Sequence, residues 1–292
     1  MGEDDGVRLL QRVQQLEREN DSLRAALRRL SRLAGRGLGV SGLGPGPGRD
    51  TMAEAPQAPG KAAAARTPVR PPLARQLTAV SADRPRLSAE LLAAAAAIDT
   101  STIHEAAGRL GSLPSAIKAI HPGMTICGPA FPVKGPPLDN LALHFAIDEA
   151  QPGDVIVADV GGVHEGGYLG EVMATSAHAR QLGGLVIDGC VRDGAALGRL
   201  GWPVFARGLC MRGTLKDLDG DFKINEPLAF GDVIVTPGDL VLGDGDGVVV
   251  IPQAMVASAV AASLKREAGE AKTMAKLRTG VTTVELSGWK RK

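Results

Sequence analysis

Between residues 153 and 208, apolar runs of strand length alternate with helical segments, and this alternation constrains the fold more than any other feature of the chain. A strand, a helix and another strand in succession favour parallel strands joined by right-handed crossovers. The predicted series of strand, helix, strand, helix and strand covers residues 153–162, 169–184, 184–189, 193–201 and 202–208.

Helices are expected on both sides of this region. Residues 88–98 predict a helix with Ser88 as its N-cap, and residues 101–111 predict a second one that ends at a glycine. Residues 254–280 predict a long helix near the end of the chain. The central alternation is therefore flanked by helical segments.

The pattern changes after residue 210. Apolar stretches within residues 230–252 are short and separated by Pro-Gly and Asp-Gly turns, which is typical of short strands. Aromatic residues make up only 3% of the chain, so the core must be built from Val, Leu, Ile and Ala. The sequence predicts one mixed α/β domain over residues 76–292, with a β-rich insertion or second layer.

Residues 1–34 carry a heptad pattern, with leucines at d positions and a single asparagine, Asn20, at an a position. This pattern predicts a parallel coiled coil that dimerises or trimerises, because charges at e and g are complementary. A single amphipathic helix packed on the domain, or one that binds another protein, remains an alternative. The heptad leucines are Leu9, Leu16, Leu23 and Leu30.

Residues 35–75 are rich in Gly, Pro and Ala, and lack hydrophobic periodicity. Such a composition buries too little apolar surface to offset the entropy of ordering, so a flexible linker is expected. Basic residues prevail over residues 1–75, whereas the remainder is mildly acidic. Nothing in the charge of the larger part suggests nucleic-acid binding.

The composition also indicates the cellular compartment. The three cysteines are far apart and form no C-x-x-C pair, which favours a reducing environment. No apolar run reaches the roughly 18 residues needed to span a bilayer. The N-terminus lacks a signal-peptide pattern. A cytoplasmic protein without a membrane segment is expected.

Two predicted strands end at the same edge of the sheet, where ligands gather in open α/β folds. After the first, a glycine-rich loop leads into a helix that starts near Gly170 and Glu171, and free N–H groups there favour an anion. After the second come Arg192 and Asp193. Arginine suits a carboxylate or enolate oxygen, and aspartate is a hard ligand for Mg²⁺ or Mn²⁺.

Four segments in order, GYLGEVMATSAHAR, GLVIDGCVRD, GWPVFARG and VTPGDLVLGDGDGVVVIP, resemble the RraA-like family. The resemblance runs from about residue 85 to 285 and is strongest to the aldolase branch. That branch includes 4-hydroxy-4-methyl-2-oxoglutarate and 4-carboxy-4-hydroxy-2-oxoadipate aldolases, which also decarboxylate oxaloacetate. The resemblance implies a compact αββα-type sandwich that forms homotrimers or homohexamers, with active sites between subunits.

The resemblance also implies roles for individual residues. The carboxylate of a small 2-oxo acid substrate is expected to meet the loop at Gly170 and the backbone amides of Glu171, Val172 and Met173. Arg192 is expected to contact the same substrate. Arg192, Asp193 and Glu171 are the expected catalytic residues.

A divalent metal, Mg²⁺ or Mn²⁺, is implied as the cofactor. Asp193 is the expected direct ligand. Metal-bound waters would be held by Glu171 and Asn140, and by Glu105 and Glu267 from a neighbouring subunit. The resemblance therefore implies a metal-dependent lyase that cleaves 4-hydroxy-2-oxo acids to pyruvate and decarboxylates oxaloacetate through a metal-held pyruvate enolate.

The sequence departs from the aldolase pattern at Ala196, where an acidic residue is usual, and this puts the aldol substrate in doubt. The alternative function is a non-catalytic regulator that binds a ribonuclease or another protein. The ribonuclease-binding family member lacks the metal-binding aspartate, so the presence of Asp193 favours an enzyme. A Schiff-base aldolase is disfavoured, because no lysine, Lys216 included, sits in an apolar strand.

Overall fold

The computed structural model describes residues 86–291 of the 292-residue chain. The predicted coiled coil (residues 1–34) and linker (residues 35–75) lie outside the described residues. The helix predicted from Ser88 is present as α2 (Ala89–Ala96), and the Ser88 hydroxyl accepts a hydrogen bond from the Leu91 amide at 3.2 Å.

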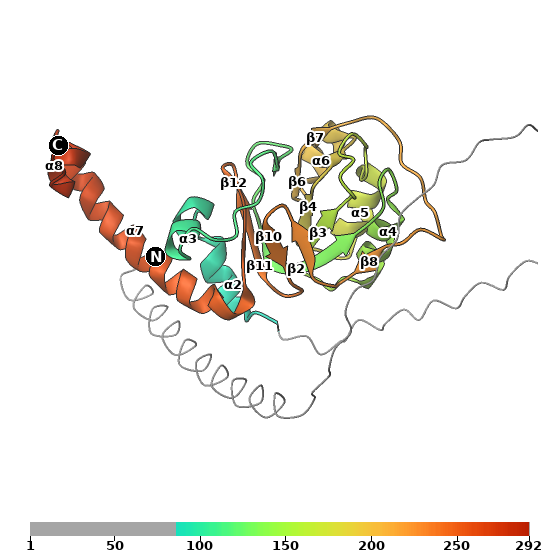
Figure 1. The fold of residues 1–292 in the computed structure, drawn as a ribbon, viewed down its shortest axis with the longest axis horizontal. Coiled ribbons are helices and arrows are strands. Elements are labelled where there is room, and N and C mark those ends of the chain that lie inside the picture. The colour runs from blue at the N-terminus through green and yellow to red at the C-terminus, as the bar shows by residue number, and fades with distance from the viewer. Residues whose placement is uncertain (1–85, 292) are drawn as a thin grey trace, which may run out of the picture. The chain divides into compact units, whose positions relative to one another are not determined.

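The centre of the domain is a sheet whose strands follow the order β1-β6-β4-β3-β2-β11-β12, with β8 also paired to β2 (Figure 1). The predicted parallel strands are confirmed as β3, β4 and β6, which pair in parallel, and β2, which was not predicted, pairs in parallel with β3. Their bounds are β2 (Ile126–Lys134), β3 (Val155–Asp159), β4 (Gly184–Ile187) and β6 (Val204–Ala206).

The β-rich segment after residue 210 completes this sheet. Strand β11 pairs antiparallel with both β12 and β2, so the two parts share one sheet. The first and last strands of the sheet approach one another, since β1 contacts β11 and β12 as well as β6. The sheet is therefore nearly closed. These strands are β1 (Lys118–Ala119), β8 (Lys223–Ile224), β11 (Leu240–Asp244) and β12 (Gly247–Ile251).

Strand β2 explains why the two parts form one sheet. Its first half, residues 126–129, pairs with β11, whereas its second half, residues 130–134, pairs with β3. One strand thus belongs to both parts. The resemblance implies an αββα-type sandwich. In the structure, a single curved sheet lies between two helical layers, in place of two separate sheets.

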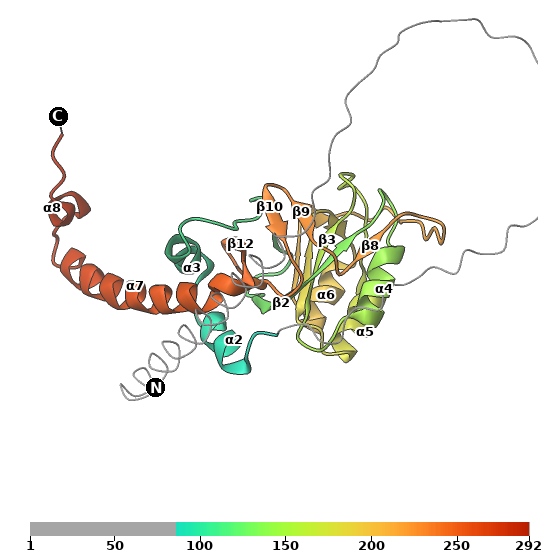
Figure 2. The ribbon, with the colours of Figure 1, turned by 60° about the horizontal axis from the view of Figure 1, so that its bottom comes forward.

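Three buried apolar clusters match this layering. Helices α4, α5 and α6 pack on the parallel strands, and α2, α3 and α7 pack on β11 and β12 (Figures 1 and 2). The third cluster fills the inside of the curved sheet around Phe205 and Val157. The helices are α3 (Thr100–Ala106), α4 (Leu141–Glu149), α5 (Glu171–Ala179), α6 (Gly194–Leu200), α7 (Val256–Leu277) and α8 (Thr283–Ser287).

Shorter elements complete the domain. A two-stranded hairpin is formed by β9 (Leu228–Phe230) and β10 (Val233–Val235), and β5 (Cys190–Val191) pairs with β7 (Gly208–Leu209). A 3-10 turn (Gln253–Met255) precedes α7. Among the described residues, no helix combines the length and apolar character that a membrane crossing requires.

Candidate functional site

The two loops singled out in the sequence lie side by side at the carboxyl ends of β3 and β4. The Tyr168 amide donates to the Cys190 carbonyl at 3.1 Å, and the Arg192 amide donates to the Leu169 carbonyl at 2.8 Å. These two bonds join residues 167–169 to residues 190–192. The prediction that both loops share one edge is confirmed.

Helix α5 begins at this junction. Its N-cap, Gly170, has an extended backbone, and the Glu171 amide donates to the Asp193 carboxylate at 3.0 Å. Within the described part of the chain, the amides of Val172 and Met173 have no acceptor. Free amides at a helix N-terminus attract anions, so the first turn of α5 holds one carboxylate of the protein and can accept another.

Gly170 is required for this arrangement by close contact rather than by its own φ. A Cβ at this position would lie 2.3 Å from Asp193 Oδ2 and 3.0 Å from Arg192 Nε. A Cβ–oxygen distance of this kind cannot be accommodated without moving one of the two groups. The side chains of Arg192 and Asp193 therefore pack directly against the backbone of the helix N-terminus.

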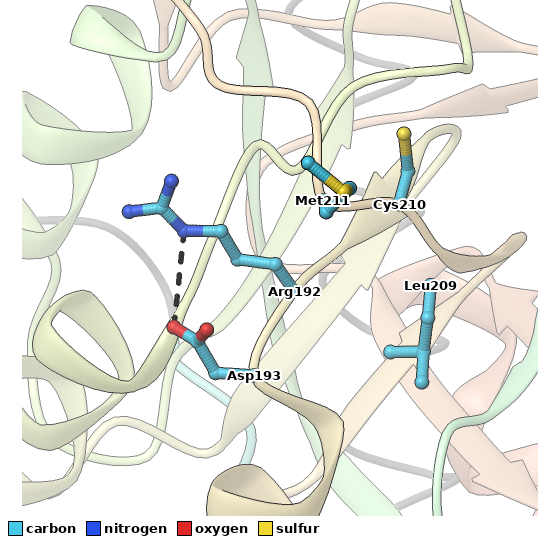
Figure 3. A pocket seen from close by; sticks show the side chains of 5 residues that line it. All are labelled: Arg192, Asp193, Leu209, Cys210 and Met211. Carbon is cyan, nitrogen blue, oxygen red and sulfur yellow. Dashed lines mark ion pairs between the residues drawn. The ribbon is translucent and has the colours of Figure 1, made fainter.

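Arg192 and Asp193 project from the loop before α6. Asp193 adopts a left-handed conformation (φ 60°), which aspartate tolerates better than most residues. The Arg192 Nε lies 3.8 Å from Asp193 Oδ2, and both side chains are about half exposed. Figure 3 shows the pair beside Leu209, Cys210 and Met211 on the following strand and loop.

A cavity of about 290 Å³ lies between these groups and α4. Asn140, the residue before α4, is buried and its Nδ2 donates to the Tyr168 carbonyl at 2.9 Å. In the described residues, Asn140 Oδ1 and His144 Nε2 are buried without a hydrogen-bond partner. Buried polar atoms are rarely left unpaired, so the cavity is suited to a polar ligand or to water.

His144 and Lys216 also line the cavity, although neither is predicted as a site residue from the sequence. Burial, and then the charge of Lys216, hold the pKa of His144 below its usual value, while Asp139 acts in the opposite direction. His144 follows Asn140 by one helical turn, a spacing that could have indicated it. No local signal points to Lys216, because its loop is placed by distant contacts.

Those contacts run to the residues before α4. The Asn140 amide donates to the Leu215 carbonyl at 3.1 Å, and the Asp217 amide donates to the Asp139 carboxylate at 2.6 Å. These two hydrogen bonds hold the loop after β7 beside the cavity. Thr214 and Lys216 of this loop therefore line the cavity.

Glu105 and Glu267 are not part of this cluster. They lie on α3 and α7, which pack together in the layer on β11 and β12 (Figure 1). Glu105 Oε2 lies 2.8 Å from Arg109. Burial, followed by the nearby Asp99 and Glu270, raises the pKa of Glu267. Within one chain, neither glutamate lines the cavity beside Asp193.

The remaining groups fit a hydrated divalent cation. No group of three or more His, Cys, Asp or Glu side chains able to hold a metal occurs in the described residues. Mg²⁺ can bind at a site that offers only one or two carboxylates, because it commonly keeps several of its water ligands. The half-exposed Asp193 carboxylate could hold the ion directly, and the unpaired Asn140 Oδ1 could accept from one of its waters.

These features define a mixed α/β protein with two unpaired amides at a helix N-terminus and an Arg-Asp pair at a shared sheet edge. The model of the RraA-like family, described as Aldolase/RraA, matches residues 95–250. The chain belongs to the RraA-like family.

Three known proteins are similar to this chain in sequence or in structure. A protein of Halalkalibacterium halodurans, provisionally named 4-hydroxy-4-methyl-2-oxoglutarate aldolase, is 36% identical over 173 residues, 59% of this chain and 81% of that protein. An uncharacterized protein of Pseudomonas syringae pv. tomato is similar in structure, with 30% identity, a TM-score of 0.60, and coverage of 68% of this chain and 92% of that one. Streptomyces coelicolor RraAS2, described as an unusual member of the RNase ES inhibitor RraA family, has 27% identity, a TM-score of 0.58, and coverage of 65% and 98%.

Proposed function

We propose that the protein is a divalent-metal-dependent lyase that cleaves 4-hydroxy-2-oxo acids of the 4-hydroxy-4-methyl-2-oxoglutarate type to pyruvate and also decarboxylates oxaloacetate. The aldolase name of the 36% identical relative supports an aldolase-like role. The observation that carries the proposal is the meeting of Arg192, Asp193 and the first turn of α5 around one cavity.

In the proposed reaction, the amides of Val172 and Met173 hold the substrate carboxylate next to C2. The guanidinium of Arg192 donates to the 2-oxo group, where negative charge develops as the bond breaks. Asp193 would hold Mg²⁺ or Mn²⁺, which would supply Lewis acidity for the cleavage. Binding at the helix N-terminus orients the substrate, and Arg192 stabilises the enolate that leaves as pyruvate.

The proposed cleavage begins at the C4 hydroxyl of the substrate. A water ordered by Glu171, which is exposed in the first turn of α5, takes the proton of the C4 hydroxyl and passes a proton on to the Glu171 carboxylate. The C3–C4 bond then breaks, its electron pair forms the enolate, and C4 becomes a carbonyl. A proton delivered to C3 gives pyruvate. Oxaloacetate reaches the same enolate by losing CO₂, so one site serves both substrates.

The proposal includes self-association as a trimer or hexamer in the cytoplasm. Glu105 and Glu267 would hold metal-bound waters only in a neighbouring copy, because in one chain they lie in the other helical layer. The substrate is a small 2-oxo acid, and neither a membrane nor a nucleic acid is needed.

Pyruvate release from both substrates, with Mg²⁺ or Mn²⁺ and then with EDTA, tests the proposal. Asp193→Asn is the sharpest variant, because asparagine tolerates the left-handed conformation and keeps an acceptor for the Glu171 amide. We expect this variant to lose at least about a hundredfold of metal-dependent turnover, on the order of 2.7 kcal/mol, with unchanged thermal unfolding. Asp246→Asn, an exposed change at the β11–β12 turn, is the matched control.

The second candidate is a non-catalytic regulator that binds a ribonuclease. It is supported by the similarity to RraAS2, whose description names an RNase inhibitor family. Release of pyruvate no faster than with free metal alone, together with binding to a ribonuclease, would favour this candidate and overturn the lyase.

A further inference from the structure

The fully buried Tyr168 has a hydroxyl group that the proposed cleavage does not use, and this hydroxyl joins two segments beside the cavity. It accepts a hydrogen bond from the Leu138 amide at 2.9 Å and donates one to the Val163 carbonyl at 2.5 Å. Burial raises the pKa of Tyr168, so the hydroxyl keeps the proton that it donates. One side chain therefore links the loop after β3 to the segment before α4.

Leu138 has a backbone conformation that leucine rarely adopts. Its φ of 53° lies in the left-handed region, where the Cβ atom of an L residue is crowded. Such a conformation persists only where the surrounding structure holds it, and it is commonest near functional sites. The Tyr168 hydroxyl provides part of that hold, because it binds the Leu138 amide directly. The loop after β3 also packs on the Leu138 side chain, since a Cβ added at Gly166 would lie 3.1 Å from Leu138 Cδ2.

The conformation of Leu138 sets the position of the loop after β7, which runs past α4 (Figure 1). The Leu138 carbonyl accepts from the Leu215 amide at 2.8 Å, and the Leu215 carbonyl accepts from the Asn140 amide at 3.1 Å. These two bonds align the loop with the residues before α4 in the manner of neighbouring parallel strands. Thr214 and Lys216, on either side of Leu215, line the cavity. A change in the backbone of Leu138 would therefore move both side chains.

The backbone of Tyr168 fixes a second group at the cavity. Asn140 Nδ2 donates to the Tyr168 carbonyl at 2.9 Å and lies 3.3 Å from Met173 Sδ. A carbonyl oxygen accepts but cannot donate, so the amide nitrogen of Asn140 faces Tyr168. This orientation leaves Asn140 Oδ1 as the unpaired atom beside the cavity, among the residues that the structure describes. Tyr168 thus acts on Asn140 both through its own carbonyl and through its hydroxyl and Leu138.

We propose that Tyr168 is a positioning residue whose hydroxyl, acting through Leu138, holds Asn140 and the loop after β7 in the arrangement that binds the metal ion and the substrate. The inference deepens the proposed function, on which it rests for what the cavity binds. Tyr168 itself contacts neither ligand in this role. Outer partners of metal-binding groups commonly change metal affinity or activity by roughly ten- to a hundredfold, so the effect is large enough to measure.

Tyr168→Phe removes the hydroxyl and keeps the ring. We expect the affinity for Mn²⁺, followed by electron paramagnetic resonance, and kcat for pyruvate release each to fall about tenfold. KM should change little, because the α5 amides proposed to hold the substrate carboxylate are not bonded to the hydroxyl. Tyr168 is the only tyrosine of the chain, so the matched control is Ser263→Ala, which removes another buried hydroxyl, bonded to the Ala259 carbonyl at 2.8 Å. Mn²⁺ affinity and kcat equal to those of the control would overturn the proposal.

Rescue separates the route through Leu138 from a general loss of packing. Asparagine has nearly the shape of leucine but tolerates the left-handed region, so Tyr168→Phe/Leu138→Asn depends less on the hydroxyl to hold this conformation. We expect the double variant to bind Mn²⁺ about threefold more tightly than Tyr168→Phe, which is half of the tenfold loss on a logarithmic scale. A double variant that binds Mn²⁺ no better than Tyr168→Phe would overturn the proposal.

Hydrogen exchange of the metal-free protein keeps the test independent of the lyase. The amides of Leu138 and Leu215 should exchange about tenfold faster in Tyr168→Phe than in the wild type, because their hydrogen bonds open more often. Unchanged exchange at both amides would overturn the proposal. Faster exchange and weaker Mn²⁺ binding in the variant, with no pyruvate release even by the wild type, would support the positioning role and refute only the lyase.

A measurement on the wild type covers the case in which Tyr168→Phe fails to fold, which circular dichroism melting would identify. The Leu138 amide should be protected from exchange in the wild type, since it donates to a buried hydroxyl. Exchange of this amide at the rate of an unbonded amide would overturn the proposal without the need for a variant.

Discussion

The parallel and the antiparallel parts of the sheet are built from the same kinds of apolar residue, yet the candidate site lies at the edge of the parallel part. The segments after β3 and β4 run to α5 and α6, and these segments meet at one edge. Strands β11 and β12 are joined by the tight turn from Asp244 to Gly247, which leaves no free strand ends. Crossover connections thus leave loops at the edge of the sheet that can form a site, whereas a tight hairpin turn leaves none.

The helices that cover the two parts differ in the same way. Helix α5 directs its free amides at the cavity, whereas α3 is fastened to the hairpin turn, since the Thr100 amide and hydroxyl donate to the Asp244 carboxylate at 2.8 and 2.7 Å. The N-terminus of one helix is open to a ligand and that of the other is occupied by the protein. We expect mutations at the loop edge of the first part to change activity and mutations in the buried core of the second part to change stability.

The largest effect is expected in the antiparallel part. Ile251 is fully buried in the cluster between β12 and the α2, α3 and α7 layer. Ile251→Ala should lower the free energy of unfolding by about 2–5 kcal/mol through lost burial and the cavity left behind. Turnover per folded molecule should be unchanged. Leu110→Ala, which truncates an exposed side chain, serves as control in the same urea titration.

Gly170→Ala should have the converse effect. The new Cβ would displace Asp193 or Arg192, and a shift of about 1 Å at a reacting group can cost roughly a hundredfold in rate. We expect that loss in pyruvate release with little change in melting temperature. Gly245→Ala, where a Cβ meets nothing within 4 Å, is the matched control. Wild-type turnover in Gly170→Ala would show that the contact with Asp193 is not needed.

The smallest effect is expected from Thr100→Val, which keeps the side-chain shape but removes one hydrogen bond to Asp244. A bond to a charged acceptor contributes about 1.5 kcal/mol or more. Burial alone would raise the pKa of Asp244, but hydrogen bonds from Thr100, Asp246 and Gly247 together lower it.

The sign of the pH dependence follows from that lowered pKa. The stabilisation is present above the unfolded-state value, near 3.8, and is lost as the pH falls through the lower folded-state value. The difference in unfolding free energy between wild type and Thr100→Val should therefore shrink below about pH 3.8. A difference that stays constant into strong acid would exclude this origin.

Much of this architecture could be predicted from local sequence. The apolar run that became β3 and the glycine before α5 are features of near neighbours in the chain, so periodicity and capping rules found them. Arg192 and Asp193 were placed correctly because both follow a predicted strand. The resemblance to the RraA-like family, which the family model confirms, added the roles expected of these residues.

Long-range contacts explain what was missed. No local pattern shows that Asp193 would accept the Glu171 amide 22 positions away, or that Lys216 would be held over the cavity through Asp139. The single curved sheet was missed for the same reason, since β2 pairs with a strand more than a hundred residues later. Periodicity reports which face of an element is buried, not against which element it packs.

Strand β2 has a consequence for the order in which the chain acquires its structure. Residues 126–129 pair only with β11. During synthesis from the N-terminus, this edge of the sheet therefore stays unpaired until residues beyond 240 have been synthesised. An unpaired strand edge is a template for association with other chains. Folding of this domain is thus slowed by this distant pairing, and a nascent chain shorter than about 245 residues should depend on chaperones to keep that edge unpaired.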